Sequence, residues 1–517
     1  MLQARQTATQ KRWTPLPTLS TCAAMLRLRL PLILAPVALA GCTLGPDYTP
    51  ATPADLGVPD AYSVPTGTAQ TADLTRWWTG FDDPLLTRLV EDARVSNLDL
   101  AQAVARLRQA RESLVQSRST LFPQLGVNGG YSRSFGITGG STNTITLPDG
   151  TISTFSTGGG QTNFTVSGDV NYQVGLFGEI RRTVEASRAR LDAAGYDYAA
   201  VLLSTQAEVA RNYLLARLYQ AQLANAQASL TLQDDNLEIA GFRVQAGLVS
   251  SLDQEQARVT RAQTAASIPQ IEQNFAAAVA RLGVLTGRAP GALRETMAAA
   301  RPIPAGPASV AAGIPADALR QRPDVRSAER TLAAATAEIG VAEAQLYPAL
   351  TISGNINGNS DTIGSVFDAL TGRLFAGLAQ TIFDGGRLRS QVRSARAAAD
   401  AALGAYKSTV LTSLEEVENA LLARQTAERR AREFQVAATA ADAAAILSRS
   451  QYRAGLTDFT TLNQQEAALL SARNGLVQAQ ADQATALVQL YLALGGGWDA
   501  SSIPAPDAPT PLAGQPR

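Results

Sequence analysis

The sequence predicts an α+β membrane protein in which two tandem units each join a pair of β-strands to very long α-helices. Three observations lead to this fold class. Residues 179–243 and 387–453 contain no proline, residues 164–174 and 350–359 alternate polar with apolar side chains, and several short motifs occur twice in the same order. Because globular helices average only about 11 or 12 residues, the two proline-free segments predict an architecture unlike that of an ordinary globular domain.

The composition argues against an enzyme and against a nucleic-acid partner. The 517 residues include 44 Lys and Arg, 44 Asp and Glu, and no His. A balanced charge gives no reason to expect nucleic acid as the main partner. The lack of His removes the commonest general base and the commonest metal ligand, and no Gly-x-x-x-x-Gly-Lys motif is present for nucleotide binding. We therefore expect no catalytic residue, no metal site and no cofactor.

The N-terminus has the features of a secretory signal peptide, which we assign to residues 1–41. Arg27 and Arg29 precede an apolar run, residues 30–40, that is shorter than the roughly 20 apolar residues needed to span a bilayer. The run ends in Leu39-Ala40-Gly41-Cys42, which resembles a bacterial lipobox, where cleavage occurs before a cysteine that then carries the lipid. Cys42 is accordingly the predicted lipid attachment site. The alternative is a buried helix with an incidental cysteine.

The residues after Cys42 predict a destination and a tether. Thr43 stands where an Asp tends to retain such lipoproteins in the inner membrane, so we expect the outer membrane. Residues 42–72 are rich in Pro, Thr, Ala and Gly, which is typical of an extended and weakly structured segment. This tether would let the anchored end reach away from the body. The sequence leaves open whether translation begins at Met1 or Met25.

An internal duplication organises the rest of the chain. The first unit is assigned to residues 73–287 and the second to residues 323–496, with a linker at residues 288–322 and a flexible tail at residues 497–517. The matched landmarks are residues 121–125 and 346–350, 176–181 and 382–387, 246–248 and 454–456, and 285–287 and 494–496. Agreement that preserves this order indicates a repeat.

Four segments are predicted to be strands that cross a bilayer. In residues 164–174 and 350–359, Thr, Ser, Asp, Asn and Gln fall on one strand face and apolar residues or Gly on the other. Residues 125–135 and 374–383 are less regular partners, which makes two hairpins. A length of about ten residues suits a tilted membrane strand, and the polar set suits a water-filled lumen. A soluble, half-buried sheet is the alternative, and residues 139–160 are expected to form a surface loop tip.

Four strands cannot complete a membrane sheet alone. The open edges of such a sheet carry unpaired N–H and C=O groups, which are not tolerated in lipid. Outer-membrane barrels begin at about eight strands. If these strands span the membrane, several copies of the chain must therefore close the cylinder.

The proline-free segments predict helices of about 100 Å, since each residue adds about 1.5 Å. Apolar residues recur in them at a period near 3.5, which is typical of coiled-coil seams. These residues are Val201, Ala207, Val209, Leu214, Leu218, Leu223 and Leu230 in the first helix, and Val410, Leu414, Val417, Leu421 and Leu422 in the second. Glu415 and Glu416 are interpreted as part of a solvated face. The alternative for these helices is a plain coiled-coil scaffold.

Each long helix is predicted to end at a Gly-Leu pair and to turn back. Gly247 and Gly455 supply the backbone freedom that ends a helix. The returning helices are expected to begin near residues 250–253 and 457–458, which contain the Ser, Asp and Thr suited to N-capping.

The chain resembles the outer-membrane efflux protein family, the TolC-like channels, and in particular the lipoprotein branch associated with resistance-nodulation-division multidrug efflux. The matching motifs cover nearly all of the chain beyond Cys42. They are residues 45–48 (GPDY), 77–85 (WWTGFDDPL), 97–100 (NLDL), 322–325 (RPDV), 383–386 (FDGG) and 452–456 (YRAGL).

This resemblance implies a homotrimer whose twelve strands close an outer-membrane barrel and whose helices form a long periplasmic barrel. It implies a mixed equatorial region built from residues 288–325 and the C-terminal end. It also implies that the helix turns face a periplasmic adaptor protein and an inner-membrane pump. The residues implied for the periplasmic gate and the adaptor contact are Gly247, Leu248, Asp253, Gly455, Leu456, Thr457, Asp458 and Thr461, for which helix capping is the alternative role.

The function implied is passive conduction of drugs or other small molecules to the exterior. The pump would supply the energy, and adaptor binding would favour the open state by its differential affinity. Two alternatives remain at this point. One is a channel of the same fold that serves type I protein secretion or metal export. The other is a non-conducting periplasmic coiled-coil lipoprotein.

Overall fold

The computed structural model describes residues 43–64, 74–135, 137, 142–148, 150–156, 161–307 and 315–505. The chain divides between Cys42 and Thr43, and every element below belongs to the second unit. The predicted signal peptide, the lipid site at Cys42, and most of the predicted C-terminal tail lie outside the described residues.

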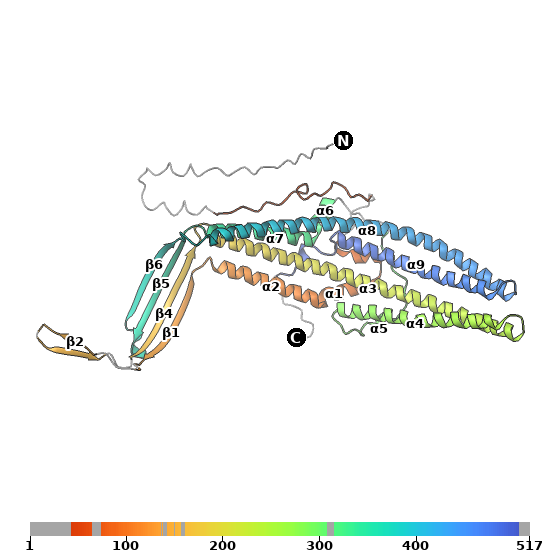
Figure 1. Ribbon diagram of the computed structural model, residues 1–517, viewed down its shortest axis with the longest axis horizontal. Helices are drawn as coiled ribbons and strands as arrows, with labels where there is room; N and C mark the ends of the chain where they lie inside the picture. Colours follow the sequence, from red (N-terminus) through yellow and green to blue (C-terminus); the bar gives the residue numbers. More distant parts are fainter. Residues whose placement is uncertain are drawn as a thin grey trace, which may run out of the picture. The chain divides into compact units, whose positions relative to one another are not determined.

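The first half of the chain contains a short helical entry, a sheet segment and one helical hairpin (Figure 1). Its elements are η1 (Leu74–Phe81), α1 (Pro84–Ser96), α2 (Leu98–Ser119), β1 (Gln124–Ser134), β2 (Thr142–Thr146), β3 (Ile152–Ser156), β4 (Gln161–Val174), α3 (Glu179–Gln245) and α4 (Ser251–Leu285). Asp83 caps α1 and Asn97 caps α2, because their side chains accept hydrogen bonds from the first main-chain N–H groups.

The second half repeats this order. Its elements are α5 (Arg294–Ala298), α6 (Pro315–Gln321), α7 (Pro323–Ala344), β5 (Ala349–Ser360), η2 (Ile363–Ser365), β6 (Leu370–Ala379), α8 (Arg387–Arg453), α9 (Phe459–Ala493) and η3 (Ala500–Ser502). The lengths match between the halves: α2 and α7 have 22 residues each, α3 and α8 have 67, and α4 and α9 have 35. The predicted long helices and their returns are confirmed.

The four predicted strands form one antiparallel sheet in the order β1-β4-β5-β6. The prediction for β6 was wrong at its ends, since the strand begins at Leu370 and does not include residues 380–383. The expected loop tip at 139–160 was also incomplete, because β2 and β3 pair there as a second, two-stranded sheet. Thr and Ile in these short segments favour extended backbone, which the loop interpretation overlooked.

Small residues allow the long helices to pack closely. In α3, Ala199, Ala207, Ala210 and Ala216 are at most 2% exposed. α3 packs against α4 and α7, while α8 packs against α9 and α7, so each long helix has neighbours on more than one side (Figure 1). Most residues of the predicted seams are buried or half-buried, while Leu422 is 50% exposed in the single chain.

The largest hydrophobic core lies near the middle of the helices. Trp77 stacks on Tyr491 with ring centroids 5.4 Å apart, and Trp78 is fully buried. Residues from the predicted equatorial region join this core through Leu293 and Met297. This core therefore joins η1 and α1 to the linker and to α9.

Candidate functional sites

The four-stranded sheet has one apolar face and one polar face, as the alternation predicted. The register aligns the faces across all four strands. The apolar face carries Leu125, Val127, Tyr131, Phe164, Val166, Val170, Tyr172, Val174, Leu350, Ile352, Ile356, Leu370, Leu374 and Leu378. The polar face carries mainly Asn, Ser, Thr and Gln, and Phe375 is its one large apolar side chain. Such a sheet is suited to a boundary between an apolar medium and water.

The apolar face is uncovered at both edges of the sheet. Val127 on β1 and Leu374 on β6 are 83% and 81% exposed. Among the described strands β1 pairs only with β4 and β6 pairs only with β5, so each edge keeps a row of main-chain groups without a strand partner. An exposed apolar surface that ends in open edges marks an interaction site.

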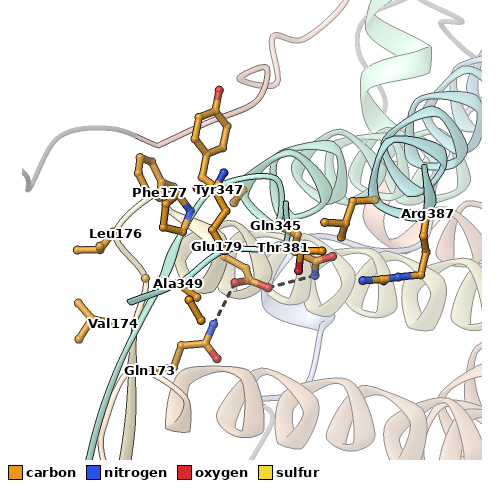
Figure 2. Close-up of a pocket in the computed structure, with 16 residues that line it drawn as sticks. Gln173, Val174, Leu176, Phe177, Glu179, Gln345, Tyr347, Ala349, Thr381 and Arg387 are labelled. Atoms are coloured by element: carbon orange, nitrogen blue, oxygen red, sulfur yellow. Dashed lines mark hydrogen bonds between the residues drawn. The ribbon is translucent and has the colours of Figure 1, made fainter. Parts of the chain in front are cut away.

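A cavity of about 440 Å³ lies where the sheet meets the helices (Figure 2). Glu179, at the start of α3, accepts hydrogen bonds from Gln173 of β4 at 3.2 Å and from Gln345 after α7 at 3.1 Å. The rings of Phe177 and Tyr347 stack beside them at 4.9 Å. These contacts join the two halves of the chain at the junction between the strands and the helices.

The N-terminal strap, which we define as residues 43–64, packs against the body. Gly45 lies so close to Gly340 of α7 that an added Cβ would be 2.4 Å from its Cα, so only glycine fits. Thr43 contacts Gly178 in the same way. The prediction of a weakly structured tether that reaches away from the body was therefore wrong for these residues. Prolines and small residues give no local pattern, and long-range contacts fix the strap instead.

Arg182 of α3 holds the beginning of the strap. Its guanidinium donates hydrogen bonds to the carbonyl oxygens of Leu44 at 3.0 Å and Gly45 at 3.1 Å, and to the carboxylate of Asp47 at 2.7 Å. The Arg182 side chain is only 4% exposed. Burial opposes its charge, but the bonds to Asp47 and Glu185 more than offset this and raise the pKa of Arg182.

Both helix turns have the predicted geometry. Gly247 and Gly455 have φ angles of +71° and +73°, which glycine adopts without strain. In each turn the glycine N–H donates to the carbonyl three residues earlier at 3.0 Å. The N–H groups of Leu248 and Leu456 donate to the carbonyls five residues earlier at 2.9 and 2.8 Å. These are the two hydrogen bonds of a Schellman motif, which ends α3 and α8 alike.

The turns expose a matched pair of leucines, since Leu248 is 70% and Leu456 is 79% exposed. Asp458 serves as the N-cap of α9, and its carboxylate accepts from the N–H of Thr461 at 2.7 Å. This hydrogen bond lowers the pKa of Asp458. Asp253 lies in the first turn of α4, and its position there suits the positive end of the helix dipole.

Buried contacts behind the turns join the two helical hairpins, and the sequence did not reveal them. The ring of Tyr452 lies 4.7 Å from the guanidinium of Arg243, which also donates to the Tyr452 carbonyl at 3.0 Å. Further along, buried Glu466 accepts from Asn236 at 2.8 Å and from Arg449 at 3.2 Å. The YRAGL motif contained Tyr452, but its partner lies 209 residues away in the chain.

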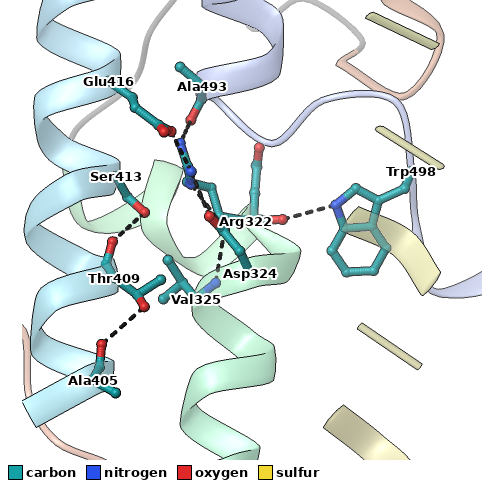
Figure 3. A network of polar contacts seen from close by, with 10 residues as sticks. Arg322, Asp324, Val325, Ala405, Thr409, Ser413, Glu416, Ala493 and Trp498 are labelled. Atoms are coloured by element: carbon teal, nitrogen blue, oxygen red, sulfur yellow. Dashed lines mark hydrogen bonds and ion pairs between the residues drawn. The ribbon is translucent and has the colours of Figure 1, made fainter. Parts of the chain in front are cut away.

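A polar network fixes the start of α7 (Figure 3). Arg322 is 6% exposed and donates to the carboxylates of Asp324 and Glu416, each at 2.6 Å, and to the carbonyl of Ala493 at 2.9 Å. The Glu416 side chain is 50% exposed, as expected of a solvated face, and its carboxylate pairs with Arg322 from that face. Burial opposes the charge of Arg322, yet both carboxylates together raise its pKa. Trp498 donates to the Gln321 carbonyl beside it at 3.1 Å.

The described residues contain no group of three or more Cys, Asp or Glu placed to hold a metal ion. Within the same part of the chain, no helix combines the length and the apolar character that crossing a membrane requires.

The family model for the outer membrane efflux protein matches residues 89–288 and 314–496. Nodulation protein T of Rhizobium leguminosarum bv. trifolii is 34% identical over 470 residues, which cover 89% of this chain and 96% of that protein. The pyoverdine export outer membrane protein OpmQ of Pseudomonas putida is 31% identical over 456 residues, which cover 87% and 95%. The solved structure of the outer-membrane channel OprN has a TM-score of 0.77 and 32% identity, and the match covers 88% of this chain and all of that one.

Proposed function

Because the chain belongs to the outer membrane efflux protein family, we propose that it is the outer-membrane channel subunit of a tripartite efflux system. Small molecules would pass through it passively, from an inner-membrane pump and a periplasmic adaptor to the exterior. It would catalyse no reaction and need no cofactor. The observation that carries this proposal is the sheet, which has one apolar face, one polar face and two open edges.

The open edges support a trimer with a twelve-stranded barrel. A lone four-stranded sheet would leave main-chain groups of β1 and β6 unpaired in lipid, which costs several kcal/mol for each group. Pairing β6 of one copy with β1 of the next satisfies these groups, and three copies reach a size typical of outer-membrane barrels. The apolar face would then contact lipid and the polar face would surround water.

Aromatic residues on the apolar face support a membrane position for the sheet. Phe164 packs against Tyr131 near one end of β4, with centroids 5.1 Å apart, and Tyr172 lies near the other end. Tyr172 follows Phe164 by eight residues. At a rise of about 3.3 Å per residue and a strand tilt of about 40°, the two rings are separated by roughly 20 Å along the membrane normal. This approaches the apolar band of about 25 Å between the aromatic girdles of known barrels.

The position of the strap is evidence for a lipid anchor at the inner boundary of this apolar band. Thr43 lies against Gly178, between β4 and α3, so a lipid on the preceding Cys42 would start close to the end of the strands. We accordingly assign residues 1–41 to a cleaved signal and Cys42 to the anchor. The matched helix lengths support two tandem repeats, at 73–287 and 323–496, joined by the equatorial linker 288–322.

The helical hairpins would extend into the periplasm and carry the gate at their turns. The exposed pair Leu248 and Leu456 offers an apolar contact to the adaptor, since burial of a leucine contributes about 1.5–3 kcal/mol. Gly247 and Gly455 set the shape of the turns. Asp458 and Thr461 act as a helix cap. Asp253 and Thr457 lie beside the turns, where they would contact another copy of the chain at the gate.

Planar-bilayer recording of the purified protein tests the proposal. A channel gives discrete conductance steps after the periplasmic turns are opened, for instance by charge substitution at Asp253. A protein that inserts and stays trimeric but never conducts would contradict it and favour a coiled-coil lipoprotein. Export assays with defined pump and adaptor partners separate drug efflux from protein secretion or metal export.

A further inference from the structure

Charged residues are rare in the sheet, and two of the three lie on one rung. Within β1, β4, β5 and β6 the charged residues are Arg133, Asp169 and Arg373. The register pairs Asp169 with Asn355, and Asn355 with Arg373. Asp169 and Arg373 therefore lie two strands apart on the same rung and on the polar face. Arg133 lies on the apolar face, toward the end of β1.

The carboxylate and the guanidinium are separate fixed charges. Asp169 is held in place, because its carboxylate accepts hydrogen bonds from Asn128 at 2.8 Å and from Ser167 at 3.1 Å. Arg373 is exposed. Two strand spacings put the two backbones about 10 Å apart, which is close to the Debye length at 0.1 M salt, and the structure forms no ion pair between these two side chains. Each charge thus acts on the water in front of the polar face.

We propose that Asp169 and Arg373 determine the charge selectivity of the lumen, and that their balance leaves the lumen open to cargo of either sign. This inference rests on the proposed trimeric barrel. There β4 and β6 recur at every second strand around the wall, so three carboxylates and three guanidinium groups alternate evenly. Because the strands tilt by about 40°, the two kinds of charge differ in depth by about 6 Å. Rings of charged side chains are the usual device for ion selectivity in wide pores.

The structure gives the size of the expected effect. Twelve strands about 4.8 Å apart, tilted by about 40°, enclose a cylinder with a radius of about 12 Å. Side chains bring the charges to about 10 Å from the axis. Three like charges at this distance, screened at 0.1 M salt, change the ratio of cation to anion permeability roughly fivefold, because they favour one ion and disfavour the other. In the wild type the two sets oppose each other.

The test is the reversal potential of single trimers in planar bilayers under a KCl gradient. Asp169→Asn should favour anions and Arg373→Gln should favour cations, each about fivefold. The double variant should return to the wild-type ratio. Arg133→Gln is the matched control, since it removes the same charge as Arg373→Gln but from the apolar face, and it should leave the ratio unchanged. Each variant is first shown to form trimers on a gel.

The outcomes separate this inference from the proposed function. Conducting variants in which Arg373→Gln and Arg133→Gln have equal reversal potentials would overturn the inference and leave the channel intact. Shifts of the same sign for Asp169→Asn and Arg373→Gln would overturn it as well. A trimeric wild type that never conducts would overturn the proposed function, and the inference with it.

Discussion

Substitution of Arg182 by alanine should release the N-terminal strap. The guanidinium of Arg182 bonds the Leu44 and Gly45 carbonyls at 3.0 and 3.1 Å. A hydrogen bond from a charged donor contributes at least about 1.5 kcal/mol to stability, so the two bonds together contribute about 3 kcal/mol. The ion pair to Asp47 adds little, because that carboxylate is 87% exposed. Since about 1.4 kcal/mol corresponds to a factor of ten, strap opening should become roughly 100-fold more frequent.

Hydrogen–deuterium exchange of the full chain in detergent measures this opening directly. Peptides that cover residues 43–50 should exchange roughly 100-fold faster in Arg182→Ala, while peptides of the large core keep their protection. Arg190→Ala is the matched control, because Arg190 lies on the same helix and its ion pair is with Glu338 of α7. The reasoning fails if both variants exchange alike in this segment, or if the whole chain loses protection in Arg182→Ala.

Three further predictions concern the turns and the core. Replacing Leu248 and Leu456 by serine should weaken adaptor binding at least tenfold, measured by surface plasmon resonance, without loss of trimers; unchanged affinity would rule out the apolar contact. Gly455→Ala places a side chain at a φ of +73° and should destabilise by about 1 kcal/mol in thermal melts. Gly404→Ala, in open space within α8, should instead stabilise by a similar amount, and equal effects would refute the argument. Burial and then the bond to Asp83 raise the pKa of Tyr213 from 10.0 to about 12. Its neutral form therefore stabilises the fold fully below pH 10 and progressively less up to pH 12, and Tyr213→Phe should flatten this part of a base titration.

The features that were best predicted from the sequence are those that a local pattern of residues determines. Helix α8 occupies the predicted residues 387–453, because its start follows Gly385-Gly386 and its end precedes Gly455, and both signals are local. The alternation in 164–174 likewise identified β4 and both of its faces. These features need only a residue and its near neighbours in the chain.

Contacts between distant residues were beyond such patterns. Glu416 gave the signal of a solvated helix face, and only the fold brings buried Arg322 to it. The composition of residues 42–72 indicated a loose tether, whereas Arg182 and Gly340 hold the strap from two different helices. The hairpin of β2 and β3 was hidden among Ser, Thr and Gly, which are common in loops.

Disulfide cross-linking between the two sheet edges tests whether three copies close the four-stranded sheets into one barrel. Asn128→Cys on β1 can be combined in turn with cysteines at Thr371, Arg373, Phe375 and Gly377 on the polar face of β6. Within one chain, three strand-to-strand spacings separate β1 from β6. This distance of about 14 Å is too long for a disulfide to bridge. A closed trimer should give, in one register, covalent species of two and three copies and none larger. Absence of cross-links in every register, or a ladder that continues beyond three copies, would contradict it.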